Sequence, residues 1–383
     1  MIGQSRVFRD MRQRLMSLIV LAVASGCSAP IPATATGTAT PSGTAIAIPT
    51  ATATSRPRPT TTQTATHTPT PIPSATARPS VRLVEVPLSP PLTIADEISD
   101  IAWSPDGAAF VATSSEGIHI YSTNEGKQTG MIPVDGGVNS AAFDPDGSRI
   151  YALVHRRVAI WDAHTGQMIG TTSEADEAFS PALGHVAAIS PDGRYFATGG
   201  TLPLRAANTV VQMLGVWDLT TGDFVRELFG NELDWALVDI AFSPDGKQLA
   251  TGSTTAFSDE VQTRLWSTAT WTFSHTLPGN SVAMSPDGTL LATSNHGVHI
   301  WNALALEPVT TLEMTGDSLS FNFRSDLLTL SANDGLHIWD AESWELLFEN
   351  SDPLAYKLEF SPTDNLLLAT GFLGPVRLWR IIH

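Results

Sequence analysis

The sequence contains one cysteine in 383 residues and few basic side chains. A lone cysteine has no partner for a disulfide within the chain. Lys and Arg number 21 against 38 Asp and Glu. Seven of the arginines but only one of the acids lie in residues 1–80, so residues 81–383 carry a net charge of −23. Such a surface excludes nucleic acid as a partner; it favours a basic partner or cations, or keeps an exported domain soluble.

Motifs for catalysis and cofactor binding are also missing. The sequence has no nucleophile motif, phosphate-binding loop, dinucleotide-binding fingerprint or zinc signature. We therefore predict no catalytic, cofactor or metal site. The segment Asp144–Ser148 begins like a calcium loop but lacks the glutamate that would end one, and we interpret it as a turn.

The apolar run near the N-terminus, Leu15–Ala24, is too short to span a bilayer comfortably. It follows a head with four arginines and one acid, Asp10, and precedes small residues. This order is typical of a secretory signal, which we place at residues 1–26. Met11 is an alternative start, because the sequence from Met11 onward already forms a complete signal.

The single cysteine, Cys27, follows this signal directly. The segment Ala24-Ser-Gly-Cys27 resembles the bacterial lipobox, although leucine is more typical at position 24. The resemblance implies that the thiol is lipidated and becomes the mature N-terminus, so that the protein is extracytoplasmic and anchored to the bacterial cell membrane. The alternative is ordinary cleavage near Ala24 or Gly26 with an incidental cysteine.

Residues 27–80 differ in composition from everything that follows. Residues 28–80 hold 16 Thr, 11 Ala and 10 Pro and no aromatic residue, and they show no apolar periodicity. No core can therefore offset the entropy that ordering would cost. We predict a disordered tether that is partly polyproline II, and its Thr-Pro clusters leave O-glycosylation open.

From residue 100 onward a turn motif recurs seven times between apolar runs. Proline presets φ, aspartate bonds to its own backbone and glycine accepts a positive φ, so each copy predicts a hairpin. The intact copies begin at Ser104, Asp144, Ser190, Ser243 and Ser285, and the decayed copies begin at Asn322 and Ser361.

Each turn is followed by a strand, a second turn and a second strand that ends on an aromatic residue. These aromatics are Tyr121, Trp161, Trp217, Trp266, Trp301, Trp339 and Trp379, at offsets of 17, 17, 27, 23, 16, 17 and 18 from the first residue of the turn. A short strand before the turn and another after the aromatic complete a unit of about forty residues, the period of a propeller blade. The sequence therefore predicts an all-β, seven-bladed β-propeller of four-stranded antiparallel blades over residues 81–383.

This pattern resembles the WD-repeat family of β-propellers. The Trp-Asp pair itself stands at positions 161, 217 and 339, and the single Gly-His pair is Gly184-His185. The sixth unit retains three of the four residues of the family's hydrogen-bond network, Ser331, Asp334 and Trp339. The resemblance implies a propeller fold. Because most of the family's network is missing, we interpret the chain as a divergent member that packs with aliphatic residues, and we expect a monomer.

The last unit is too short to complete itself, because four residues follow Trp379. An open strand edge would remain, and proteins avoid such edges. The segment Arg82–Val86 alternates as a strand should, and we predict that it closes the ring outside Val376–Trp379, as the family's closure does.

Charged residues near the inner strands are sparse. Glu359 stands where the other six units have alanine or serine, so it must reach water in the channel, pair with a residue such as Lys357, or have a raised pKa. It marks either a channel site or an irregularity near the closure. His119, His299 and His337 share one position in three units, and we expect separate structural roles for them.

Long insertions fall in the loops of one end of units two to four, at 173–184, 201–209, 230–237 and 254–260. Acidic and apolar residues together favour a protein-binding patch there, with Trp235 as its anchor; the alternative is tolerated surface growth. The candidate residues are Glu174, Asp176, Glu177, Phe179, Leu202, Leu204, Glu232, Asp234, Trp235, Phe257, Asp259 and Glu260.

We therefore expect a lipid-anchored binding module for a protein or peptide of basic or mixed charge. The alternative is a propeller enzyme or metabolite sensor, lactonase-like or dehydrogenase-like, with a site at the central channel. Asp100, Asp239, Lys357 and Glu359 are the residues from which such a site could be built. Fold alone does not decide between these functions, because propellers host both.

Overall fold

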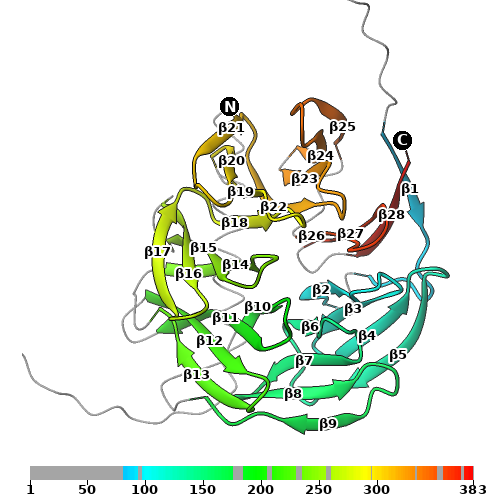
Figure 1. Cartoon of the computed structure of the whole chain (residues 1–383). Coiled ribbons are helices and arrows are strands. Elements are labelled where there is room, and N and C mark those ends of the chain that lie inside the picture. The colour runs from blue at the N-terminus through cyan, green and yellow to red at the C-terminus, as the bar shows by residue number, and fades with distance from the viewer. Residues whose placement is uncertain are drawn as a thin grey trace, which may run out of the picture. The chain divides into compact units, whose positions relative to one another are not determined.

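The computed structural model describes residues 81–93, 97–175, 184–204, 209–229, 235–255, 260–294, 296–332, 334–351, 357–371 and 375–382, with backbone only at 184, 185, 201–204, 209 and 210. The regular secondary structure of these residues consists of β-strands. The strands form seven four-stranded antiparallel sheets arranged around a centre (Figure 1). The predicted propeller is confirmed. The described residues include no helix long and apolar enough to cross a bilayer. The predicted signal, Cys27 and the tether lie outside the described residues.

The blades follow one another around the ring, and in each of the first six the strands run outward in sequence order. Blade 1 contains β2 (Asp100–Trp103), β3 (Ala109–Ser114), β4 (Gly117–Ser122) and β5 (Lys127–Pro133). Blade 2 contains β6 (Ala141–Phe143), β7 (Arg149–Val154), β8 (Arg157–Asp162) and β9 (Met168–Thr171). Blade 3 contains β10 (Gly184–Ile189), β11 (Tyr195–Leu204), β12 (Thr209–Asp218) and β13 (Asp223–Glu227).

The remaining blades repeat this order. Blade 4 contains β14 (Trp235–Phe242), β15 (Gln248–Thr255), β16 (Val261–Ser267) and β17 (Thr272–Leu277). Blade 5 contains β18 (Ser281–Met284), β19 (Leu290–Ser294), β20 (Val298–Asn302) and β21 (Pro308–Leu312). Blade 6 contains β22 (Gly316–Phe321), β23 (Leu327–Ala332), β24 (Gly335–Asp340) and β25 (Leu346–Asn350). Blade 7 contains β26 (Lys357–Phe360), β27 (Leu366–Thr370), β28 (Val376–Ile382) and β1 (Arg82–Val86).

The recurrent turns form because the Ser and Asp side chains satisfy the turn's own backbone. In blade 4, Ser243 Oγ donates to Asp245 Oδ1 at 2.7 Å and accepts from the Gln248 amide at 2.9 Å. Gly246 has a φ of 69°, which costs a glycine little. The hydrogen bond from Ser243 and the contacts with Lys247 lower the pKa of Asp245 to about 2. The decayed sixth copy keeps its turn, because Asn322 Oδ1 accepts from the Leu327 amide at 2.9 Å.

Strand β1 closes the ring as predicted. It pairs antiparallel with β28, from Arg82 opposite Ile382 to Val86 opposite Leu378. It therefore supplies the fourth strand that the C-terminal unit lacks. Leu83 packs with the buried cluster that lies between blades 6 and 7, which includes Ile381 at 3% exposure. The N-terminal strand thus covers both the backbone edge and an apolar surface of blade 7.

The aromatic residues of the third strands hold the blades together. Trp217 in β12 is fully buried, and its ring centroid lies 5.0 Å from that of Phe224 and 6.4 Å from that of Phe196. Its Nε1 donates to the carbonyl of Ser173, which precedes blade 3, at 3.3 Å. Each buried cluster combines residues of adjacent blades, so the core is a series of interfaces between sheets.

Parts of three predicted loop insertions are strand extensions instead, and one of these parts is Thr254–Thr255 at the end of β15. In blade 3, β11 and β12 are ten residues each and remain paired as far as Leu204 opposite Thr209, so 201–204 belongs to a strand. In blade 4, β14 begins at Trp235, which pairs with Thr255. The assignment of 230–237 as loop was therefore wrong for Trp235–Leu237. Insertion length alone does not distinguish a longer hairpin from a longer loop.

Candidate functional site

The seven inner strands share one position whose side chains link neighbouring blades. It lies three residues before the last residue of each inner strand. Around the ring this position holds Asp100, Ser140, Val186, Asp239, Ser281, Ser318 and Lys357. Ser281 Oγ donates to Asp239 Oδ2 at 3.2 Å, and the Leu358 amide donates to Ser318 Oγ at 2.9 Å. The ring therefore joins blade 4 to blade 5 and blade 6 to blade 7 from inside the channel.

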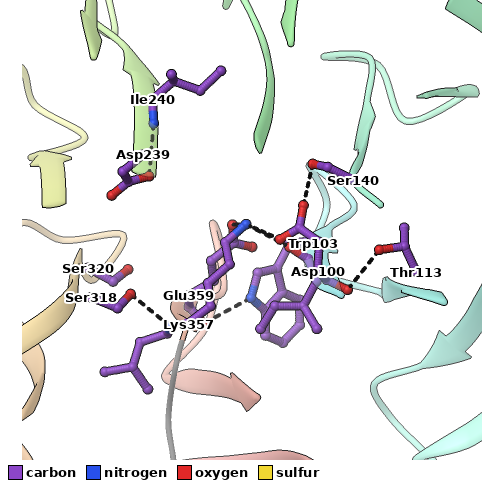
Figure 2. Close-up of polar contacts among 12 residues, drawn as sticks. Asp100, Trp103, Thr113, Ser140, Asp239, Ile240, Ser318, Ser320, Lys357 and Glu359 are labelled. Carbon is purple, nitrogen blue, oxygen red and sulfur yellow. Dashed lines mark hydrogen bonds and ion pairs between the residues drawn. The ribbon is translucent and has the colours of Figure 1, made fainter. Parts of the chain in front are cut away.

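A cluster of charged side chains occupies this ring at the junction of blades 7, 1 and 2 (Figure 2). Asp100 is 2% exposed; its Oδ1 accepts from Lys357 Nζ at 2.5 Å and its Oδ2 accepts from Ser140 Oγ. Lys357 Nζ also donates to the Ile101 carbonyl at 3.2 Å and contacts Glu359 Oε1 at 3.1 Å. An ammonium group has three donors, and all three now have an acceptor.

The charge state of Lys357 follows from these neighbours. Burial alone would lower the pKa of its ammonium group, but the carboxylates of Asp100 and Glu359 outweigh burial and raise the pKa above its ordinary value. Lys357 is therefore a permanent cation at physiological pH, held by two carboxylates of different blades.

For Glu359 the sequence allowed three alternatives: contact with water, a partner such as Lys357, or a raised pKa. The structure shows all three. Glu359 pairs with Lys357, its side chain remains 30% exposed, and its pKa is raised. Burial is the main cause of the raised pKa; Lys357 opposes it, and Asp100 and Asp239 add to it. Its backbone carbonyl accepts from Trp103 Nε1 at 3.0 Å, which fixes the strand against blade 1. The carboxylate thus faces the channel from a rigid backbone.

Asp239 lies across the channel in β14 and is partly accessible to solvent (Figure 2). Its Oδ2 accepts from the Val282 amide at 2.9 Å and from Ser281. Burial raises its pKa to about 6, although these hydrogen bonds and the charge of Lys357 act in the opposite direction. Three carboxylates therefore share the electrostatic environment of a single ammonium group.

An open hollow of about 280 Å³ adjoins the cluster. It extends from Lys357 along β26 to Pro362 in the following turn, so it lies toward the end of the propeller that carries the recurrent turns. Its walls come from blades 7, 1, 2 and 3. They consist of Lys357 and Glu359 together with small and aromatic residues: Ala102, Trp103, Pro105, Ala141, Ala142, Phe143, Ala187, Phe360 and Pro362. Ala102 and Ala142, which stand at the position of Glu359 in blades 1 and 2, are among the small side chains that line the hollow.

The histidines that share a sequence position lie apart, as expected, in β4, β20 and β24. His119 Nε2 lies 3.0 Å from Ser114 Oγ, and His337 Nε2 lies 3.5 Å from Asp334 Oδ1. His299 Nδ1 lies 3.3 Å from Thr311 Oγ1. Each histidine thus has a local partner within its own blade. Within the described ranges no three His, Cys, Asp or Glu side chains form a group that could hold a metal ion.

The candidate partner-binding residues are described only in part. Trp235 is partly exposed, and Glu260 lies at the same end of blade 4, since the Thr255 amide donates to the Glu260 carbonyl at 2.9 Å. Glu174 lies at the corresponding end of blade 2, where it pairs with Arg157 at 2.8 Å, and this pair lowers its pKa. Leu202 and Leu204 belong to β11, with backbone placement only. Outside the described residues lie Asp176, Glu177, Phe179, Glu232, Asp234, Phe257 and Asp259.

The comparisons with known proteins concern the repeat. Residues 222–256 and 270–302 match the family model described as WD domain, G-beta repeat. These segments cover β13 of blade 3, three strands of blade 4 (β14, β15 and β17) and β18 to β20 of blade 5. Together with the seven blades they support the WD-repeat propeller prediction. No curated protein matches the chain.

Sequence reasoning named all four charged residues of the channel but not their arrangement. It missed Ser140, which donates a hydrogen bond to the second carboxylate oxygen of Asp100. It also missed Trp103, whose Nε1 donates to the backbone carbonyl of Glu359. An alignment of the seven inner strands on the last residue before the turn places Asp100, Ser140 and Lys357 in one column, and that column was the available signal.

Proposed function

We propose that this protein is a lipid-anchored, extracytoplasmic binding module whose propeller captures a protein partner of basic or mixed charge. WD-repeat propellers are commonly protein-interaction scaffolds. The observation that carries the proposal is the lengthening of the β11–β12 hairpin. Its strands have ten residues each, whereas β19 and β20 of blade 5 have five.

This lengthening favours one end of the propeller as the binding surface. The additional residues of β11 and β12 extend blade 3 at the end opposite the recurrent turns, and β14 of blade 4 is lengthened at the same end, where it begins at Trp235. Paired backbone is a more rigid platform than an irregular loop. Trp is prominent among the residues that dominate protein interfaces, so a partly exposed Trp235 on this platform suits a partner anchor.

A binding role, rather than catalysis, also fits the charged cluster. A lysine that acts as nucleophile or base must be deprotonated, and the two carboxylates beside Lys357 raise its pKa instead. All three of its donors have acceptors. We therefore propose no catalytic step at this position.

The partner surface is tested by a double substitution, Trp235→Ala with Glu260→Lys. We expect capture of the partner from an extract of the cell envelope to fall by roughly tenfold or more, because a central Trp is typically worth 2 kcal/mol or more in an interface. The measurement is quantitative capture on immobilised full-length protein, followed by identification of the bound protein by mass spectrometry.

The matched control is Leu304→Ala with Glu307→Lys, which changes an exposed apolar and an exposed acidic residue in the β20–β21 turn at the other end of the propeller. This control should capture the same protein as wild type does. Loss of capture in the control alone would place the partner surface at the opposite end and contradict the proposal.

The anchor is tested by Cys27→Ala. Two acyl chains hold a protein at a membrane where one would be marginal, at about 0.8 kcal/mol per buried CH₂. We expect the variant to accumulate as an uncleaved precursor that carries no lipid, measured by mass spectrometry after fractionation. Processing and lipidation identical to wild type would show that Cys27 is not the attachment site.

A further inference from the structure

The hollow beside Lys357 has the composition of a small ligand site, because its walls are mostly apolar and its charged side chains come from one strand, β26. Its volume, about 280 Å³, lies just below the range for drug-sized pockets, roughly 300–1,000 Å³, so it suits a small ligand. Most of the lining is alanine, proline and aromatic, and two side chains are charged. A site of this kind takes a short apolar chain that carries one polar group.

Lys357 does not supply the recognition of an anionic ligand. Its three N–H donors are directed to Asp100 Oδ1, the Ile101 carbonyl and Glu359 Oε1. An anion would have to displace one of these acceptors, and it would approach a site that contains three carboxylates and one ammonium group. The cation of the cluster is therefore already neutralised.

Glu359 is the charged residue of the hollow that can still accept a hydrogen bond from a ligand. Its Oε1 contacts Lys357, and among the described residues no side chain or amide donates to its Oε2. The side chain is 30% exposed and lines the hollow, so a carboxylate oxygen is accessible to a ligand that donates. Asp100 is 2% exposed and has partners on both oxygens, so it contributes charge without being accessible.

We propose that this hollow binds an alkylammonium group, with the carboxylate of Glu359 as acceptor and the alanine and aromatic walls around the alkyl chain. A calcium ion is a poor fit, because it takes six to eight oxygen ligands and the hollow offers one accessible carboxylate. An alkylammonium group matches both features, since it combines N–H donors with an apolar chain. This inference does not depend on the proposed partner surface, which lies at the other end of the propeller.

The test is a binding titration of the full-length protein with n-butylamine, and with n-butanol as the uncharged probe of similar shape. We expect n-butylamine to bind and n-butanol to bind at least tenfold more weakly, because the alcohol can still donate an O–H but carries no positive charge to pair with the carboxylate. Glu359→Gln, which keeps the shape, should weaken n-butylamine binding by roughly tenfold or more. Equal binding of the two probes, or unchanged binding to Glu359→Gln, would overturn the proposal.

Two further variants separate binding in the hollow from other effects. Ala142→Leu fills the hollow and leaves the charged cluster intact, so it should abolish n-butylamine binding without changing the ion pairs. Glu307→Gln removes an exposed carboxylate outside the hollow and should bind as wild type does. Retained binding in Ala142→Leu would show that the amine binds elsewhere.

The same alkylammonium group could belong to a free amine or to a lysine side chain of another protein. A blocked tripeptide, N-acetyl-Gly-Lys-Gly-amide, and its Nε-acetylated form distinguish these sources. Binding of the tripeptide with loss on acetylation identifies a lysine side chain as the ligand. Binding of n-butylamine without binding of the tripeptide identifies a free amine.

Discussion

Deletion of β1, residues 82–86, is expected to destabilise the propeller by about 3–5 kcal/mol and to lower its melting temperature by roughly 5–10 °C. The deletion removes the pairing along β28 and uncovers apolar residues of blade 7, including Ile381, which is 3% exposed in the intact protein. An uncovered strand edge also pairs readily with another chain. We therefore expect self-association as well, measured by size-exclusion chromatography beside thermal unfolding.

The matched control for this deletion is Val84→Ser. Val84 lies in the same strand but is 47% exposed, so its replacement keeps the backbone pairing and removes little buried surface. Its melting temperature should stay within a degree or two of wild type, and the protein should remain monodisperse. If the deletion variant stays monodisperse and has the melting temperature of wild type, β1 is not required to close the ring.

The second large effect is expected from Lys357→Met. This change removes the ammonium group and leaves the carboxylates of Asp100 and Glu359 without their shared cation. Loss of one partner from a buried ion pair typically costs about 3–5 kcal/mol, because the remaining charge stays desolvated. The free energy of unfolding at pH 7, obtained from urea titration, measures this loss.

The loss should depend on pH in a defined direction. A carboxyl whose pKa is higher in the folded than in the unfolded state costs stability above the unfolded value, and this cost disappears as the pH falls and the folded state takes up the proton. The pKa of Glu359 is already raised above its ordinary value of 4.5 in the intact protein, and removal of Lys357 takes away the charge that opposes this rise. The stability difference between wild type and Lys357→Met should therefore shrink between pH 7 and about pH 4.5.

An exposed ion pair provides the comparison for this effect. Lys247 and Asp245 lie 3.0 Å apart, but their side chains are 80% and 55% exposed. Pairs of this kind contribute about 0–1 kcal/mol, so Lys247→Met should change stability little. If Lys357→Met proved no more harmful than Lys247→Met, the channel cluster would have no role in joining the blades.

Local sequence was sufficient to predict the blades because the determinants of each blade lie close together in the chain. Ser243 and Asp245 organise their turn through bonds that span at most five residues. The closing strand was also predictable, since the missing fourth strand of the last unit required a partner for its edge. The sixth turn kept its shape although Ser325 occupies the glycine position with a φ of 61°.

The channel site could be predicted only as a set of residues. The bond between Lys357 and Asp100 joins positions 257 residues apart. Ring closure places blades 7 and 1 side by side, but it does not specify that these two side chains reach each other. The pairing of Glu359 with Lys357 was foreseeable because they are two residues apart on one strand. The saturation of the ammonium group by the Ile101 carbonyl depends on the angle between blades, which the sequence does not express.

The closure of the ring has a mechanical consequence. Residue 81 leads directly into β1, so tension transmitted along the N-terminal segment reaches this strand before any other part of the propeller. The five residue pairs between β1 and β28 are then the first contacts to be loaded. Under a pulling force the propeller is therefore expected to open first at blade 7, the blade that also contains Lys357 and Glu359.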